Sequence, residues 1–417
     1  MKVFSLVLVS VLTWSAPSNS PAQGIMDLHS DSMVSWEISG QPAEFEALWH
    51  TMDSMRFQHA GSLSCLYIGG SHVQAGWIGH GIRQRFEAAF PSSDRTRGWL
   101  LPYRMAQTDT PTHFRTETTG LWSGMRCTRS GHEAPFGSPG LRAHTDDANA
   151  TWQHVSIRAD SSLHEASSLE VWGDASGCIP TWLGHETLIN REVLRNGSGW
   201  MFEFDTAVDT VHFGLESIGP GPLSFDLFAT IQRFSSSDAP QFMLFEWGNN
   251  GAKIASAMRC EAWENEWPSL DLDLVFLGLG INDVHAAGHT WDARRFEVAY
   301  DSLVQRIQKA APHAALVLLS NTDSMQKGKT MAVRSQQVHT VQQKVAKRWD
   351  CGIFDMGQAM GPPGCIRDWH ELGLAQSDLI HFTPAGYDSL ADLLFSSWIA
   401  AYESHRTSRS VPSSRER

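Results

Sequence analysis

Apolar runs that alternate with amphipathic helical patterns frame both ends of this chain, and they restrict its fold more than any other feature. The apolar runs, each short enough for a buried strand, are residues 64–69, 274–277, 315–319 and 352–354. The helical patterns are residues 77–90, 292–310 and 333–349, with a last helix from Pro384 to about residue 402. Strands alternating with helices of this length predict an α/β domain, a parallel sheet with helices on both faces.

The pattern changes between residues 108 and 239, where the helical period disappears. Short β-rich runs separated by Gly, Ser, Thr and Asp occur at 152–157, 168–172, 200–204, 210–215 and 224–234. Such spacing is typical of an antiparallel β-sandwich. We therefore expect a sandwich inserted at 108–239 into one catalytic domain formed by 23–107 and 240–402. The Ser/Arg-rich tail, 403–417, is expected to be disordered.

The first 22 residues read as a signal peptide, with Lys2 before a short apolar core and a run of small residues. We expect a periplasmic or secreted protein without a transmembrane span in the mature chain; an uncleaved N-terminal anchor is the alternative. The formal net charge is −13, so the chain lacks the basic field that nucleic-acid binding needs.

Export would permit disulfide bonds between the six cysteines. Cys351 with Cys365 and Cys127 with Cys178 are the candidate pairs, whereas Cys65, inside an apolar run, is expected to be a buried free thiol. The chain has no C-x-x-C motif and no H-E-x-x-H motif, so we expect neither a metal nor another cofactor.

Candidate catalytic residues follow the predicted strands, where α/β enzymes carry their functional groups. The turn Gly69-Gly70-Ser71 comes directly after the first strand and leaves Ser71 at a helix start; a plain helix cap is the alternative. Gly251, in Asn249-Asn250-Gly251, could offer a bare backbone N–H to a ligand oxygen, or simply form a turn.

Two further segments complete the candidate set. Asn282 follows the strand at 274–277 and could donate its amide to an oxyanion, although an Asx-turn is equally consistent. Asp378 stands three residues before His381, and a carboxylate there can orient an imidazole that accepts a serine proton. We interpret Asp283 as structural.

In this order these segments resemble the SGNH, or GDSL-type, hydrolase family. Ser71 matches its first block, Gly251 its second, Asn282 its Gly-x-Asn-Asp block, and Asp378 and His381 its Asp-x-x-His block. The resemblance covers about residues 60–107 and 240–402. It implies a three-layer, flavodoxin-like α/β fold.

The same resemblance implies acyl transfer through a covalent ester. Ser71 would be the nucleophile, His381 the base and Asp378 its partner, with the Ser71 and Gly251 N–H groups and the Asn282 amide as the oxyanion hole. One residue departs from the family: Gly70 stands where its first block usually has Asp, which puts the rigidity of the turn and the rate in question. His72 and Gln74 are possible pocket residues.

An SGNH domain split by a β-sandwich resembles the periplasmic peptidoglycan O-acetylesterases, whose insertion is similar to a carbohydrate-binding module. An exposed tryptophan could stack on a sugar there, or the tryptophans could be core: Trp122, Trp152, Trp172, Trp182 and Trp200. The leading hypothesis is an esterase that removes O-acetyl groups from peptidoglycan or a related acylated polysaccharide. The alternatives are an O-acetyltransferase, a lipase or thioesterase, and a glycan-binding protein that has lost turnover.

Overall fold

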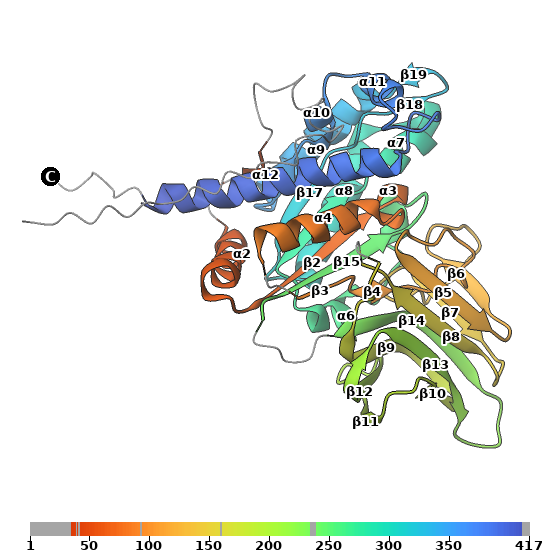
Figure 1. Ribbon diagram of the computed structural model, residues 1–417. Helices are drawn as coiled ribbons and strands as arrows, with labels where there is room; N and C mark the ends of the chain where they lie inside the picture. The colour runs from red at the N-terminus through yellow and green to blue at the C-terminus, as the bar shows by residue number, and fades with distance from the viewer. Residues whose placement is uncertain are drawn as a thin grey trace, which may run out of the picture.

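The computed structural model describes residues 35–410, apart from 39, 41, 92–93, 159–160 and 234–238. A seven-stranded sheet, in the order β1-β20-β17-β16-β2-β15-β3, forms the centre of one part of the molecule (Figure 1). β1 pairs antiparallel with β20, and the other neighbours pair in parallel. The strands are β1 (Glu37–Ile38), β2 (Ser62–Gly69), β3 (Asp94–Thr96), β15 (Gln241–Gly248), β16 (Leu274–Gly278), β17 (Ala315–Leu319) and β20 (Gly352–Phe354).

Helices cover both faces of this sheet because its inner strands are apolar on both faces. In β2, Leu66 and Ile68 join the core beneath one helical layer, and Cys65 and Tyr67 join the core beneath the other. The first layer contains α8 (Ala293–Ala310) and α9 (Ala332–Arg348), and the second contains α2 (Ala43–Asp53), α4 (Trp77–Ala89) and α12 (Pro384–Ser410). The predicted three-layer α/β fold is confirmed.

The last helix is longer than the sequence pattern predicts. It begins at Pro384, where Thr383 Oγ1 accepts the Gly386 N–H at 3.2 Å, but it continues to Ser410. Arg406 stabilises the extension, because its guanidinium pairs with Glu403 and Asp53 and lies 4.6 Å from the centroid of the Phe57 ring. The prediction of disorder is therefore wrong for residues 403–410, and 411–417 lie outside the described residues.

Two antiparallel sheets occupy the middle of the chain, in the orders β10-β13-β8-β5 and β11-β12-β9-β14-β7-β6. They face each other, since the Trp152 ring of β8 stacks on Phe225 of β14 with centroids 5.4 Å apart. The strands are β5 (Phe114–Thr119), β6 (Ser123–Arg126), β7 (Leu141–Thr145), β8 (Thr151–Ser156), β9 (Ala166–Ser176), β10 (Cys178–Trp182), β11 (Leu188–Val193), β12 (Gly199–Val208), β13 (Thr210–Ser217) and β14 (Ser224–Arg233).

The antiparallel sheets begin before residue 108, because β4 (Trp99–Leu100) pairs with β14. Trp99 also packs edge-on against Phe245 of the parallel sheet at 5.2 Å and against Trp172 of β9 at 6.2 Å. One hydrophobic core thus runs from the antiparallel sheets into the α/β part. We propose that 108–239 is a unit inserted between two parts of one domain, with β4 as an added strand.

All six cysteines are buried free thiols, so neither predicted disulfide is present. One cysteine of each predicted pair has another partner: Cys178 Sγ donates to the Ser224 carbonyl and Cys351 Sγ to the Trp349 carbonyl, both at 3.5 Å. Burial raises the pKa of the Cys351 thiol to about 12, which keeps it protonated.

Within the described part of the chain, none of the helices combines the length and the apolar character that a membrane crossing requires. The predicted signal peptide, residues 1–22, lies outside the described residues.

Candidate active site

The turn that carries Ser71 lies where three neighbouring strands end at the same level. Gly69 of β2 is in register with Gly248 of β15 on one side and with Gly278 of β16 on the other. The short helix α3 (Ser71–Gln74) begins directly after this row and packs down on it. A Cβ at Gly69 would lie 2.4 Å from Val73 Cγ2, and one at Gly248 would lie 2.4 Å from the backbone nitrogen of Gln74. Glycine at these strand ends therefore lets the helix start close to the sheet.

Ser71, His381 and Asp378 form one line of hydrogen-bonding groups. Ser71 Oγ lies 2.9 Å from His381 Nε2, and His381 Nδ1 lies 2.6 Å from Asp378 Oδ2. The other carboxylate oxygen of Asp378 accepts the N–H groups of Ile380 and His381, each at 2.9 Å. Burial opposes ionisation of Asp378, but these hydrogen bonds outweigh it and lower the pKa of the carboxyl below its ordinary value. The carboxylate is thus charged and held in place beside the imidazole.

Gly251 lies at the tip of the loop after β15, with a φ of +75°. A side chain would be strained in this left-handed conformation, although a Cβ there would meet no atom within 4 Å. Among the described residues, no acceptor is paired with the Gly251 N–H. The Ser71 N–H stands in the first turn of α3, where a helix leaves its N–H groups without helical partners.

Asn282 lies in the first turn of α7 (Ile281–Ala287), after β16. Its Nδ2 donates to the Ala252 carbonyl at 3.0 Å, so one of the two amide N–H groups is used to orient the side chain. A Cβ at Gly70 would lie only 2.8 Å from the same Nδ2. In this structure, the Asn282 amide thus lies close to the space that a side chain at position 70 would need.

Asp283 holds the segment that follows Gly251. Its carboxylate accepts the Ile254 N–H at 3.3 Å, in keeping with the structural role expected for it. Burial raises the pKa of this carboxyl to about 7, against the opposing effect of that hydrogen bond.

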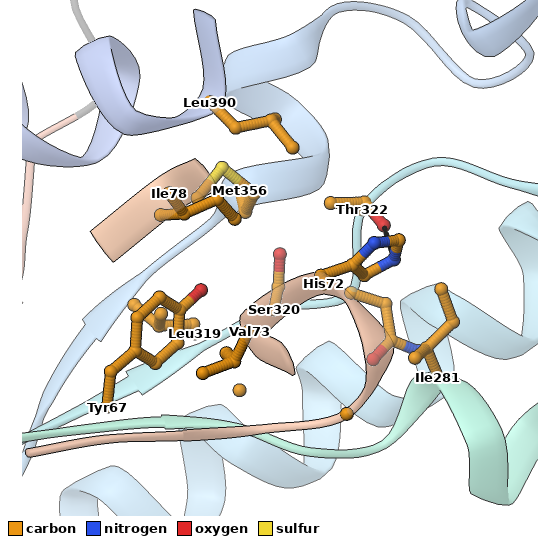
Figure 2. A pocket seen from close by; sticks show the side chains of 13 residues that line it. Tyr67, His72, Val73, Ile78, Ile281, Leu319, Ser320, Thr322, Met356 and Leu390 are labelled. Carbon is orange, nitrogen blue, oxygen red and sulfur yellow. Dashed lines mark hydrogen bonds between the residues drawn. The ribbon is translucent and has the colours of Figure 1, made fainter. Parts of the chain in front are cut away.

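His72 lines a small cavity together with Tyr67, Ile78, Ser320 and Met356, as Figure 2 shows. Its Nδ1 lies 3.2 Å from the Tyr387 hydroxyl, and its Nε2 lies 3.5 Å from Thr322 Oγ1. Burial, and then the charge of His381, lower the pKa of His72 to about 3, so the ring is neutral near pH 7.

Gln74 does not belong to the lining of the cavity that His72 lines. The residue is 2% exposed, and its side chain is hydrogen-bonded to two other segments, at Thr108 and Asp109 and at Asn250. Sequence reasoning missed Asp109 and Asn250, which contact each other through Asp109 Oδ2 and Asn250 Nδ2 at 2.7 Å. Asn250 stood next to a predicted site residue, but Asp109 carries no local signal, because only the folded chain brings it to this loop.

Residues 238–388 match the family model of the GDSL-like lipase/acylhydrolase family. The match lies entirely after the antiparallel sheets in the sequence. It therefore does not include Ser71, which precedes these sheets, whereas the other residues of the candidate triad and oxyanion hole follow them. This part of the chain is thus similar to GDSL-like lipases and acylhydrolases. The comparison with curated proteins found no match.

A solved structure of a peptidoglycan O-acetylesterase is similar to the chain over its whole architecture. The TM-score is 0.68 at 18% identity, and the match covers 88% of this chain and 99% of that one. At this identity the likeness shows a shared fold, antiparallel sheets included. An alpha/beta hydrolase from the metagenome of Lake Arreo, Spain, matches with 23% identity and a TM-score of 0.31, covering 37% of this chain and 72% of its own. A catalytic mutant of an acetylxylan esterase from Geobacillus stearothermophilus matches with 17% identity and a TM-score of 0.31, covering 38% and 72%.

Proposed function

We propose that this protein is a serine esterase that removes O-acetyl groups from peptidoglycan or a related polysaccharide. The observation that carries the proposal is the continuous contact from Ser71 Oγ through His381 to Asp378, at 2.9 and 2.6 Å. A serine hydroxyl is a weak nucleophile alone, and an adjacent neutral imidazole activates it by taking its proton.

In the first half of the reaction, Ser71 Oγ attacks the acetyl carbonyl and His381 Nε2 takes the hydroxyl proton. Asp378 stabilises the resulting imidazolium through Nδ1. The carbonyl oxygen gains negative charge beside the Gly251 N–H and the remaining N–H of Asn282, and His381 then passes its proton to the departing sugar oxygen. An acetyl ester on Ser71 remains.

In the second half, water takes the place of the sugar hydroxyl. His381 removes a proton from it, the oxygen attacks the acetyl carbonyl, and acetate leaves as the Ser71 oxygen regains its proton. The His381 and Asp378 side chains are 36% and 43% exposed, so the site is open to solvent. This openness lets water reach the acetyl ester on Ser71.

The polysaccharide substrate rests on the shared fold with a peptidoglycan O-acetylesterase and on the predicted export of the chain. We propose a periplasmic or secreted location on the same grounds. The tryptophans of the antiparallel sheets do not add to this argument. Trp152 and Trp172 are fully buried, and Trp122, Trp182 and Trp200 pack partly buried against the core, as the core interpretation predicts.

The test is acetate release from O-acetylated peptidoglycan, with de-acetylated glycan added as a competing acceptor. We expect free acetate from the wild-type protein and none from Ser71→Ala. Acetyl transfer to the added glycan in preference to hydrolysis would indicate a transferase, and glycan binding without acetate release would contradict the esterase.

A further inference from the structure

The Gln74 side chain is a buried junction between three segments of the chain. Its Oε1 accepts the Asn250 N–H at 2.6 Å, and its Nε2 donates to Thr108 Oγ1 at 2.9 Å and to the Asp109 carbonyl at 2.6 Å. Both amide N–H groups and the carbonyl oxygen are thus used. Gln74 follows the nucleophile by one turn of α3, Asn250 precedes Gly251, and residues 108–109 lead into the antiparallel sheets.

Two further hydrogen bonds hold the Gly251 loop from the same side. Asn250 Nδ2 donates to Asp109 Oδ2 at 2.7 Å, and Asn249 Nδ2 donates to the Pro139 carbonyl, just before β7, at 3.0 Å. Every residue that accepts these two bonds belongs to 108–239. The loop before Gly251 is therefore held by the inserted unit.

This support matters because the tip of the loop has little packing of its own. Within the loop the Ala252 N–H donates to the Asn249 carbonyl at 2.9 Å, but Gly251 is exposed and a Cβ there would have no atom within 4 Å, so packing does not fix the direction of its N–H. That direction depends on the neighbours: Asn250 is held by Gln74 and Asp109, and the Ala252 carbonyl by Asn282. An oxyanion donor acts only when it is fixed in place before the charge develops.

We propose that Gln74 is a positioning residue through which the inserted sheets hold the Gly251 N–H toward the nucleophile, so that the insertion completes the oxyanion hole. The inference rests on the proposed serine-esterase function. It implies that the inserted unit is part of the catalytic machinery and that a change in residues 108–109 alters turnover even for a small ester that never reaches a glycan-binding surface.

The first test is Gln74→Met, which keeps the length of the side chain and removes its three hydrogen bonds. We expect kcat for a chromogenic acetate ester to fall about 10- to 100-fold with KM within about threefold, since the donor is displaced and not removed. The inhibition constant of a trifluoromethyl ketone, which forms a tetrahedral oxyanion adduct with a serine, should rise by a similar factor. A purely structural role would not lower kcat and raise this inhibition constant by a similar factor.

The matched control is Gln232→Met. Gln232 is 1% exposed in β14, and its Nε2 donates to the His164 carbonyl at 3.1 Å and not to the loop before Gly251. We expect this variant to lower the melting temperature and leave kcat unchanged. Equal losses of kcat in the two variants, or a Gln74→Met kcat within threefold of wild type, would overturn the proposal.

Two substitutions at Asp109 provide a second test that does not depend on a change in a buried side chain. Asp109 is exposed, so Asp109→Ala removes the bond from Asn250 without opening a cavity, whereas Asp109→Asn keeps an acceptor there. We expect Asp109→Ala to lose about 3- to 10-fold in kcat and Asp109→Asn to recover most of it. Equal kcat in the two variants would contradict the inference. Full activity in Ser71→Ala is a separate outcome, which would remove the proposed function itself.

Discussion

The substitution Gly70→Ala tests how closely the turn beside the nucleophile fits Asn282. The added Cβ would lie 2.8 Å from Asn282 Nδ2, about 0.6 Å short of the 3.4 Å at which ordinary contacts begin. The backbone φ of −91° carries no left-handed penalty, and the amide is the end of a side chain. We therefore expect the amide to retreat from the methyl group, away from the position in which Ala252 holds it.

The magnitude follows from this displacement. A misplacement of about 1 Å costs about 100-fold in rate, and complete loss of an oxyanion donor costs about 10²–10³. A retreat of roughly 0.6 Å should therefore lower kcat about 10- to 100-fold, or about 1.4–2.7 kcal/mol of transition-state stabilisation. KM should change little, because the oxyanion forms only after the substrate binds.

The assay is steady-state hydrolysis of a chromogenic acetate ester by Gly70→Ala, Asn282→Ala and the double variant. Gly219→Ala is the matched control, since a Cβ at Gly219 would meet no atom within 4 Å. If Gly70 acts through Asn282, adding Gly70→Ala to Asn282→Ala should cost almost nothing further. Multiplying effects in the double variant, or an unchanged kcat in Gly70→Ala, would refute the reasoning.

Three other predictions follow from single contacts. Asn282→Ala should lower kcat about 10²–10³-fold while the melting temperature stays near wild type, and near-normal turnover would exclude it as an oxyanion donor. His72→Gln should leave the acid limb of the kcat/KM profile where it is, because burial lowers the pKa of His72 to about 3 and the ring is neutral across the working range; a displaced limb would show that His72 titrates there. Burial raises the pKa of Glu266 from 4.5 to about 7, so between these values the unfolded chain loses this proton while the folded chain keeps it, and stability falls as pH rises. Glu266→Gln should remove that decline. In chemical unfolding, the free energy of unfolding of the variant relative to the wild type should rise by up to about 3 kcal/mol between pH 4.5 and pH 8, and a difference that stays constant with pH would contradict the prediction.

The α/β part could be predicted because its strands are continuous apolar runs and its helices have regular apolar periods. Asp292 illustrates how local the signals are: it caps α8 by accepting the N–H groups of Arg294 and Arg295, next to the predicted start at 292. The end of α12 could not be predicted in the same way. Arg406 stabilises it through Asp53 and Phe57, which are distant in the sequence.

The same distinction holds for the candidate site. Ser71, Gly251 and Asn282 could be predicted because each follows a strand in a short motif. Asp378 and His381 lie just before α12, in a short motif of their own, and the structure brings His381 against Ser71. Gln74 was predicted as a possible pocket residue. Its hydrogen bonds could not be predicted, because its neighbours at 108–109 and 250 meet only in the folded chain. In the sequence, Gly70 reads as the loss of a family residue, whereas in the structure a Cβ at this position would lie 2.8 Å from Asn282 Nδ2.

The central claim is that Ser71, activated by His381, attacks an acyl ester. Its most direct test is hydrolysis of p-nitrophenyl acetate by the folded wild-type protein and by Ser71→Ala, measured side by side. We predict turnover by the wild type and its loss in the variant, with the same melting temperature for both. Equal turnover by the two proteins, or a folded wild type without activity, would contradict the account.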